Sequence, residues 1–100
     1  MASITISSAS ADQWATMTDV KKGVIVQIGG TFVGTVSIQR RPAASLGLSH
    51  PWVTVDTQSS ATVRVADENG LADYRVGVAL VGDYTSGTIY CNLQSLNVEG

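Results

Sequence analysis

The sequence is poor in the residues that carry most protein chemistry. Among its 100 residues it has one cysteine, Cys91, and one histidine, His50. A single thiol cannot form an internal disulfide, so the fold is expected not to depend on oxidation. A zinc site would need further ligands at a suitable spacing, which the chain lacks. A serine or cysteine nucleophile would have to use His50, and no residue beside His50 marks one. We therefore expect no catalytic residues, no metal and no other cofactor.

Charged residues and long apolar runs are also scarce. Charged residues make up 14% of the chain, with six Lys and Arg against eight Asp and Glu. This balance provides no positive field that would gather nucleic acid or an anionic membrane. The apolar runs are far shorter than the ~20 residues that span a bilayer, and no basic segment followed by an apolar stretch marks a signal peptide. We expect synthesis in a reducing cytoplasm, with neither nucleic acid nor membrane as a partner.

The residues that are abundant favour β-structure. Val, Ile and Thr together account for 29 residues, and β-branched side chains pack well on a pleated surface. Short alternating segments separated by turn residues predict about seven strands. We predict an all-β fold, an antiparallel β-sandwich of the Ig-like or jelly-roll-like kind, with a small closed β-barrel as the alternative. Parallel α/β architectures are excluded because no helical pattern of 10–15 residues lies between the strands.

Alternation along each strand predicts which residues face the core. Cys91 is expected to point inward between Ile89 and Leu93, where a buried thiol acts as a small hydrophobic group. The pair at 29–30, Gly-Gly, is expected to form a tight hairpin turn that leads into one return strand over 31–40. Two further strands are predicted to turn their valines inward and their polar residues outward. The predicted inward residues on these two strands are Val53, Val55, Val63 and Val65, and the predicted outward residues are Trp52, Thr54, Asp56, Thr62 and Arg64.

The first 20 residues alternate weakly. Apart from a short strand at 4–6, we predict an N-terminal arm or irregular segment over residues 1–20 and a single β-sandwich domain over 21–100. One helical turn is possible near residue 14, because Trp14 and Met17 are three residues apart.

Several apolar, aromatic and basic residues in otherwise polar segments are candidates for an interface. Exposed aromatic side chains in one patch would form a binding surface, able to stack on sugar rings or to anchor a protein partner. Packing beneath the N-terminal segment is the alternative for these aromatics, and simple solvation is the alternative for the arginine pair. The candidate interface residues are Trp14, Met17, Arg40, Arg41, Leu46, Leu48 and Trp52.

Four stretches together resemble a known family. They are GTFVGTVSIQR at 30–40, WVTV at 52–55, ADYRVGV at 72–78 and GDYTSGT at 82–88. They are similar to the small β-sandwich proteins of tailed bacteriophages, especially those that decorate or cement the head. The similarity covers roughly residues 23–95, and its motifs are a hairpin, a strand beginning with tryptophan and a Tyr-Arg-x-Gly strand.

The resemblance implies a structural virion protein that is made in the host cytoplasm and lies on the capsid surface. Its partners would be the major capsid protein and further copies of itself, in a homotrimer, and its role would be to stabilise the shell without catalysis. Two alternatives stay open from the sequence. One is a structural component of the phage tail, neck or fibre, and the other is a carbohydrate-binding β-sandwich module that uses Trp52, Tyr84 and Tyr90.

Overall fold

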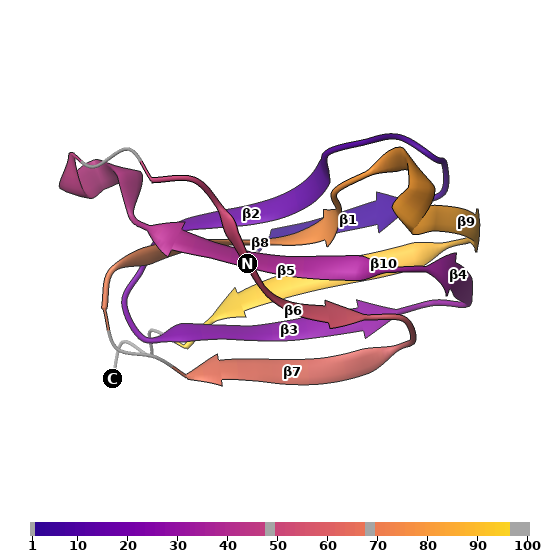
Figure 1. Cartoon of the computed structure of the whole chain (residues 1–100). Helices are drawn as coiled ribbons and strands as arrows, with labels where there is room; N and C mark the ends of the chain where they lie inside the picture. Colours follow the sequence, from indigo (N-terminus) through magenta and orange to yellow (C-terminus); the bar gives the residue numbers. More distant parts are fainter. Residues whose placement is uncertain (1, 48–49, 68–69, 97–100) are drawn as a thin grey trace.

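The protein folds into two four-stranded antiparallel sheets and one short two-stranded ribbon (Figure 1). The computed structural model describes residues 2–47, 50–67 and 70–96. Within these ranges no helix is long and apolar enough to cross a membrane. The described elements are β1 (Ala2–Ile6), β2 (Gln13–Val20), β3 (Gly23–Gly29), β4 (Phe32–Gly34), β5 (Val36–Pro42), η1 (Ala44–Leu46), β6 (Val53–Gln58), β7 (Thr62–Asp67), β8 (Ala72–Val78), η2 (Val81–Asp83), β9 (Tyr84–Gly87) and β10 (Ile89–Ser95).

The strand order is that of a jelly roll. The first sheet has the order β1-β10-β3-β7 and the second has the order β2-β8-β5-β6, while β4 pairs with β9. The eight longer strands therefore form four antiparallel pairs, β1 with β10, β2 with β8, β3 with β7 and β5 with β6. This is the pairing of one long antiparallel ribbon folded over itself, and it makes two packed sheets. The predicted antiparallel β-sandwich is confirmed, and its order is jelly-roll-like rather than Ig-like.

The core lies between the two sheets and consists almost entirely of alternate residues from their strands. Alternation works because successive side chains of a strand point to opposite faces. In β8, Tyr74, Val76 and Val78 are fully buried, and in β10 the same is true of Ile89 and Leu93. Burying a Val or Ile side chain contributes about 1.5–3 kcal/mol relative to leaving it in water. The buried apolar cluster also includes Ile6, Ala15, Val20, Val24, Val26, Ile28, Val36, Ile38, Ala72 and Cys91.

The N-terminal residues belong to the sandwich, which corrects the prediction of an arm or irregular segment over 1–20. β1 pairs with β10 at an edge of the first sheet, and β2 pairs with β8 at an edge of the second. Ile6, Ala15 and Val20 are buried. The expected helical turn near Trp14 is instead part of β2. Weak alternation arises because β2 is irregular: its register shifts between Met17 and Val20.

The pair at 29–30 does not form a hairpin, and the predicted return strand is divided in two. β3 pairs with β10 and β7, whereas β4 pairs with β9 and β5 pairs with β6 and β8. The chain leaves the first sheet after β3 and enters the second at β5, so β4 is a crossing segment at one end of the sandwich (Figure 1). Gly34 is the last residue of β4. A Cβ atom there would lie 2.2 Å from the carbonyl oxygen of Asp83, so this close approach of the two backbones requires glycine.

The valines of β7 face outward, contrary to the prediction. Val63 and Val65 are 57% and 61% exposed. Arg64 lies between them, and it is opposite Val26, whose side chain is buried in the core. Arg64 therefore points toward the space between the sheets, where its Nε lies 3.1 Å from Oδ2 of Asp56 on β6. An inward charge on an edge strand discourages further strand pairing. On β7 the side chain of Arg64, and not that of a valine, takes the inward position at the margin of the core.

The valines of β6 are exposed for a related reason. Val53 and Val55 are 57% and 52% exposed. Asp56 is opposite the buried Ile38, and the register then shifts so that Thr54 is opposite the next residue of β5. Val55 is the extra residue in the β-bulge that this shift produces. Asp56, which was predicted to face solvent, points inward instead.

The burial of Cys91 makes a measurable prediction. Burial raises the pKa of this thiol to about 12, so at pH 8 almost none of it is the reactive thiolate. We expect iodoacetamide at pH 8 to leave Cys91 unmodified in the folded protein and to modify it fully in concentrated guanidinium chloride, as measured by intact-protein mass spectrometry. Rapid modification under native conditions would contradict the burial of this strand.

Candidate functional site

The outer face of the second sheet carries a cluster of aromatic and basic side chains. β8 alternates, so the residues between its buried positions point away from the core, and these include Asp73 and Arg75. The ladder places Arg75 opposite Gln39 of β5 and Asp73 opposite Arg41. On the other side of β8, Trp14 of β2 is opposite Gly77. Residues from three strands thus meet on one face because each occupies an outward register position.

Two tryptophans and two arginines stack on one another there. The Cζ atom of Arg75 lies 4.1 Å from the centroid of the Trp14 ring and 4.5 Å from that of Trp52. The Cζ atom of Arg41 lies 4.3 Å from the centroid of the same Trp52 ring. A guanidinium at this distance from an indole is attracted by the quadrupole of the ring. We call Trp14, Arg41, Trp52 and Arg75 the tryptophan–arginine face.

A relay of hydrogen bonds holds Arg75 in place. Its Nε donates to Oε1 of Gln39 over 2.7 Å, and Nε2 of Gln39 donates to Oγ1 of Thr54 over 3.0 Å. Trp14 is held at the other side, since its Nε1 donates to Oδ1 of Asp12 over 3.3 Å. Side chains fixed in this way have already lost much of the rotamer freedom that binding would otherwise cost.

Asp73 anchors Arg41, the second arginine of the face. Its side chain is 1% exposed and accepts hydrogen bonds from Arg41 Nε at 2.9 Å, from the backbone N–H of Asp19 at 3.0 Å and from that of Ala44 at 3.2 Å. Burial by itself raises the pKa of Asp73, but the three donors together outweigh it and hold the pKa below its ordinary value. Asp73 is therefore a buried carboxylate that ties β2, β5 and η1 to β8.

Arg75 is the less neutralised of the two cations. Burial lowers the pKa of Arg75, the nearby carboxylate of Asp12 opposes that effect, and the neighbouring Arg41 adds to the lowering. Arginine still stays charged at neutral pH, because its ordinary pKa is far above 7. The face therefore presents a held positive charge between indole rings, a combination suited to a partner with a carboxylate or an aromatic ring.

The structure brings three of the predicted interface residues together and separates the others. Trp14, Arg41 and Trp52 lie on the tryptophan–arginine face. Arg40 points the other way, and its Nε donates to the hydroxyl of Tyr74 over 3.0 Å. The remaining three predicted residues have separate fates: Met17 packs against the core, Leu46 is exposed on η1 and Leu48 lies outside the described residues.

Sequence reasoning missed Arg75 as a member of this face, and Gln39 and Asp73 as the residues that hold its two arginines. The signal for Arg75 was its place between the apolar Tyr74 and Val76, which predicts an outward side chain. That signal did not reveal its neighbours, because they come from strands distant in the sequence.

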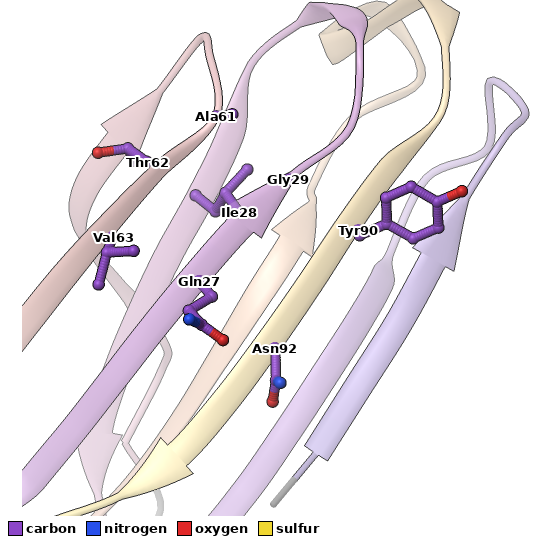
Figure 2. Close-up of a pocket in the computed structure, with 8 residues that line it drawn as sticks. All are labelled: Gln27, Ile28, Gly29, Ala61, Thr62, Val63, Tyr90 and Asn92. Carbon is purple, nitrogen blue, oxygen red and sulfur yellow. The ribbon is translucent and has the colours of Figure 1, made fainter.

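A second feature lies on the outer face of the first sheet. A groove of about 560 Å³ is lined by Gln27, Ile28, Gly29, Ala61, Thr62, Val63, Tyr90 and Asn92 (Figure 2). Tyr90 is 54% exposed. We call this feature the Tyr90 groove.

Trp52 and Tyr90 occupy opposite faces of the sandwich. The hydroxyl of Tyr84 donates a hydrogen bond to the carbonyl oxygen of Gly87. These three aromatic residues therefore do not form one sugar-binding patch.

Acidic residues do not gather into a metal site within the described ranges. No group of three or more His, Cys, Asp or Glu side chains there is arranged to hold a metal ion. Asp83 accepts a hydrogen bond from the backbone N–H of Leu80, which is the ordinary role of an acid in a turn.

Comparison of the chain with protein-family models, with curated proteins and with solved structures gives no match.

Asp73 is expected to make stability depend on pH. Because its pKa is lower in the folded protein than in the unfolded chain, its contribution is complete above the unfolded value and is lost as pH falls through the folded value. The free energy of unfolding should stay level at neutral pH and fall below about pH 4. Asp73→Asn should lower it by about 3 kcal/mol at pH 7, since one partner of a buried pair is removed.

Urea denaturation between pH 3 and pH 7 measures both effects. Asp56→Asn is the control, because the pair of Asp56 with Arg64 is exposed and contributes at most about 1 kcal/mol. Equal losses in the two variants at pH 7 would contradict the anchoring role of Asp73.

Gly77 is expected to be needed for β2 to reach β8. A Cβ atom at Gly77 would lie 1.8 Å from the carbonyl oxygen of Gln13, so Gly77→Ala must push β2 and Trp14 away from Arg75. We expect a loss of about 2–3 kcal/mol in unfolding free energy and a changed tryptophan fluorescence spectrum. Gly82→Ala is the matched control, because a Cβ atom there meets nothing within 4 Å. Similar behaviour of the two variants would contradict this packing.

Proposed function

We propose that this chain is a non-catalytic structural protein of a tailed-phage particle, one that binds the outer surface of the capsid and stabilises it. The tryptophan–arginine face is the surface that makes the contact. The observation that carries the proposal is the stack of Arg75 against Trp14 and Trp52, half-buried on the outer face of the second sheet. Tryptophan and arginine are the residues that most often dominate the binding energy of protein interfaces.

Two further observations support the assignment to a particle. The four stretches that resemble phage decoration proteins fall on β4, β5, β6, β8 and β9, together with the turns that flank them. The jelly-roll order is also one that viral capsid domains use. That second argument is an analogy between folds, and because one fold serves many functions it supports the proposal only in combination with the surface.

The proposal also includes association with further copies of the chain. β6 and β7 are edge strands, and each carries two valines that are more than half exposed. Exposed apolar side chains that lie together mark a surface that packs against another chain. A trimer would place three tryptophan–arginine faces on the shell at once, and linked weak contacts then give high avidity.

The test is binding to heads that lack this protein, prepared from the phage whose genome encodes it. The purified chain should co-sediment with these heads. Trp52→Ala and Arg75→Ala should each weaken binding by about 30-fold, because an anchor of this kind costs 2 kcal/mol or more when truncated. Gln27→Ala, which changes an exposed side chain on β3 of the first sheet, should bind as the unaltered chain does.

Three outcomes would count against parts of this proposal. Failure of the folded chain to bind heads would contradict the capsid role, and binding to isolated tails instead would move the protein to another part of the particle. Unchanged binding of both folded face variants would contradict the tryptophan–arginine face as the contact. A monomeric mass by light scattering at high concentration would contradict the self-association.

A further inference from the structure

The Tyr90 groove is lined by uncharged residues only. The polar residues among those that line it are Gln27, Asn92, Thr62 and Tyr90, and the others are apolar. A site without charge has nothing to neutralise a phosphate, a carboxylate or a metal ion. Its volume of about 560 Å³ lies within the range of small-molecule sites, 300–1,000 Å³. The groove therefore suits a neutral ligand that has both hydroxyl groups and apolar faces.

The two amides form the floor. Asn92 on β10 and Gln27 on β3 are directly opposite each other in the ladder, so their side chains are neighbours. Within the described chain Oδ1 of Asn92 is buried and has no hydrogen-bond donor. A buried acceptor without a donor is unfavourable by about the cost of a lost hydrogen bond. A ligand hydroxyl that reached Oδ1 of Asn92 would supply the missing donor.

The sides of the groove are apolar. Tyr90 lies on β10, two residues before Asn92, and Val63 lies on β7, opposite Gln27 (Figure 2). Space exists between them because the residue opposite Tyr90 on β3 is Gly29, which has no side chain. An exposed aromatic ring provides a flat apolar surface that packs against aliphatic C–H groups.

We propose that the Tyr90 groove binds a neutral saccharide. One pyranose ring packs its C–H face on Tyr90, and its hydroxyls bond the amides of Gln27 and Asn92, one of them donating to Oδ1 of Asn92. A hydroxyl is the group that serves both amides, since it donates and accepts. This site is on the opposite sheet from the tryptophan–arginine face, so it does not depend on the proposed capsid role.

The experiment is a titration of the isotope-labelled full chain followed by amide NMR. The probes are the methyl glycosides of glucose, galactose, mannose and N-acetylglucosamine, added separately. At least one should shift the backbone signals of β3, β7 and β10 in a saturable way and leave β2 and β8 unchanged. Tyr90→Ala should weaken the binding of that sugar at least about tenfold, while Tyr90→Phe keeps the ring and retains most of it.

Gly29→Val is a second variant that blocks the groove without disturbing the fold. A Cβ atom at Gly29 meets only the Cβ of Tyr90, at 4.0 Å, so the added side chain occupies the groove and should abolish binding. Trp52→Ala is the matched aromatic control on the other face and should bind the sugar as before.

Saturable binding that Gly29→Val and Tyr90→Ala remove would support the proposal. Absence of a saturable shift with all four glycosides would overturn it, as would sugar-induced shifts confined to β2 and β8. Shifts of β3 and β10 that arise from a neutral Gly-Ser-Thr peptide and from none of the sugars would also overturn it. Because none of these measurements uses phage heads, their outcome is separate from that of the capsid experiment.

Discussion

The buried carboxylate of Asp73 is the interaction on which the second sheet depends. A charge that is 1% exposed is stable only when donors surround it, and here the donors come from the end of β2, from β5 and from η1. Asp19, whose N–H is one of them, has a positive φ of 57° at the irregular end of β2. The carboxylate thus holds an uncommon backbone conformation and an arginine side chain in the same place.

β8 links that anchor to both the core and the surface. Its inward residues, Tyr74 and Val76, fill the space between the sheets. Of its outward residues, Arg75 belongs to the tryptophan–arginine face and Asp73 anchors Arg41 of that face. The same packing that stabilises the sandwich therefore also makes the face rigid. A rigid face loses little entropy on binding, which favours the proposed contact through a few side chains.

The two outer faces of the sandwich are chemically different. The second sheet presents indoles and guanidinium groups, whereas the first presents amides, a tyrosine and valine around a groove. The proposed shell contact and the proposed sugar site therefore belong to opposite sides of one molecule. A protein that is attached through one face leaves the other free for a second partner, and the two activities would then be independent.

Part of the site was accessible from the sequence. Trp14, Arg41 and Trp52 stand out as large aromatic or basic residues in polar surroundings, and they do share a face. Arg75, Gln39 and Asp73 did not stand out, because an outward residue on a strand becomes functional only through its neighbours on adjacent strands. Those neighbours are 36 residues away for the bond of Arg75 to Gln39 and 54 residues away for the bond of Asp73 to Asp19.

The residues alone determined the class of fold and the burial of strands in the middle of each sheet. Alternation in β8 and β10 was sufficient to place Tyr74, Val76, Cys91 and Leu93 in the core, since both sides of these strands are covered by neighbours. Only the tertiary structure decided the edges: that Val63 faces solvent, that the segment 31–40 crosses between sheets and that the N-terminal residues complete both of them. Local periodicity indicates that a strand has two different faces. Which face is covered depends on the strands that lie beside it and opposite it. In a jelly roll these are distant in the sequence, since the first strand pairs with the last.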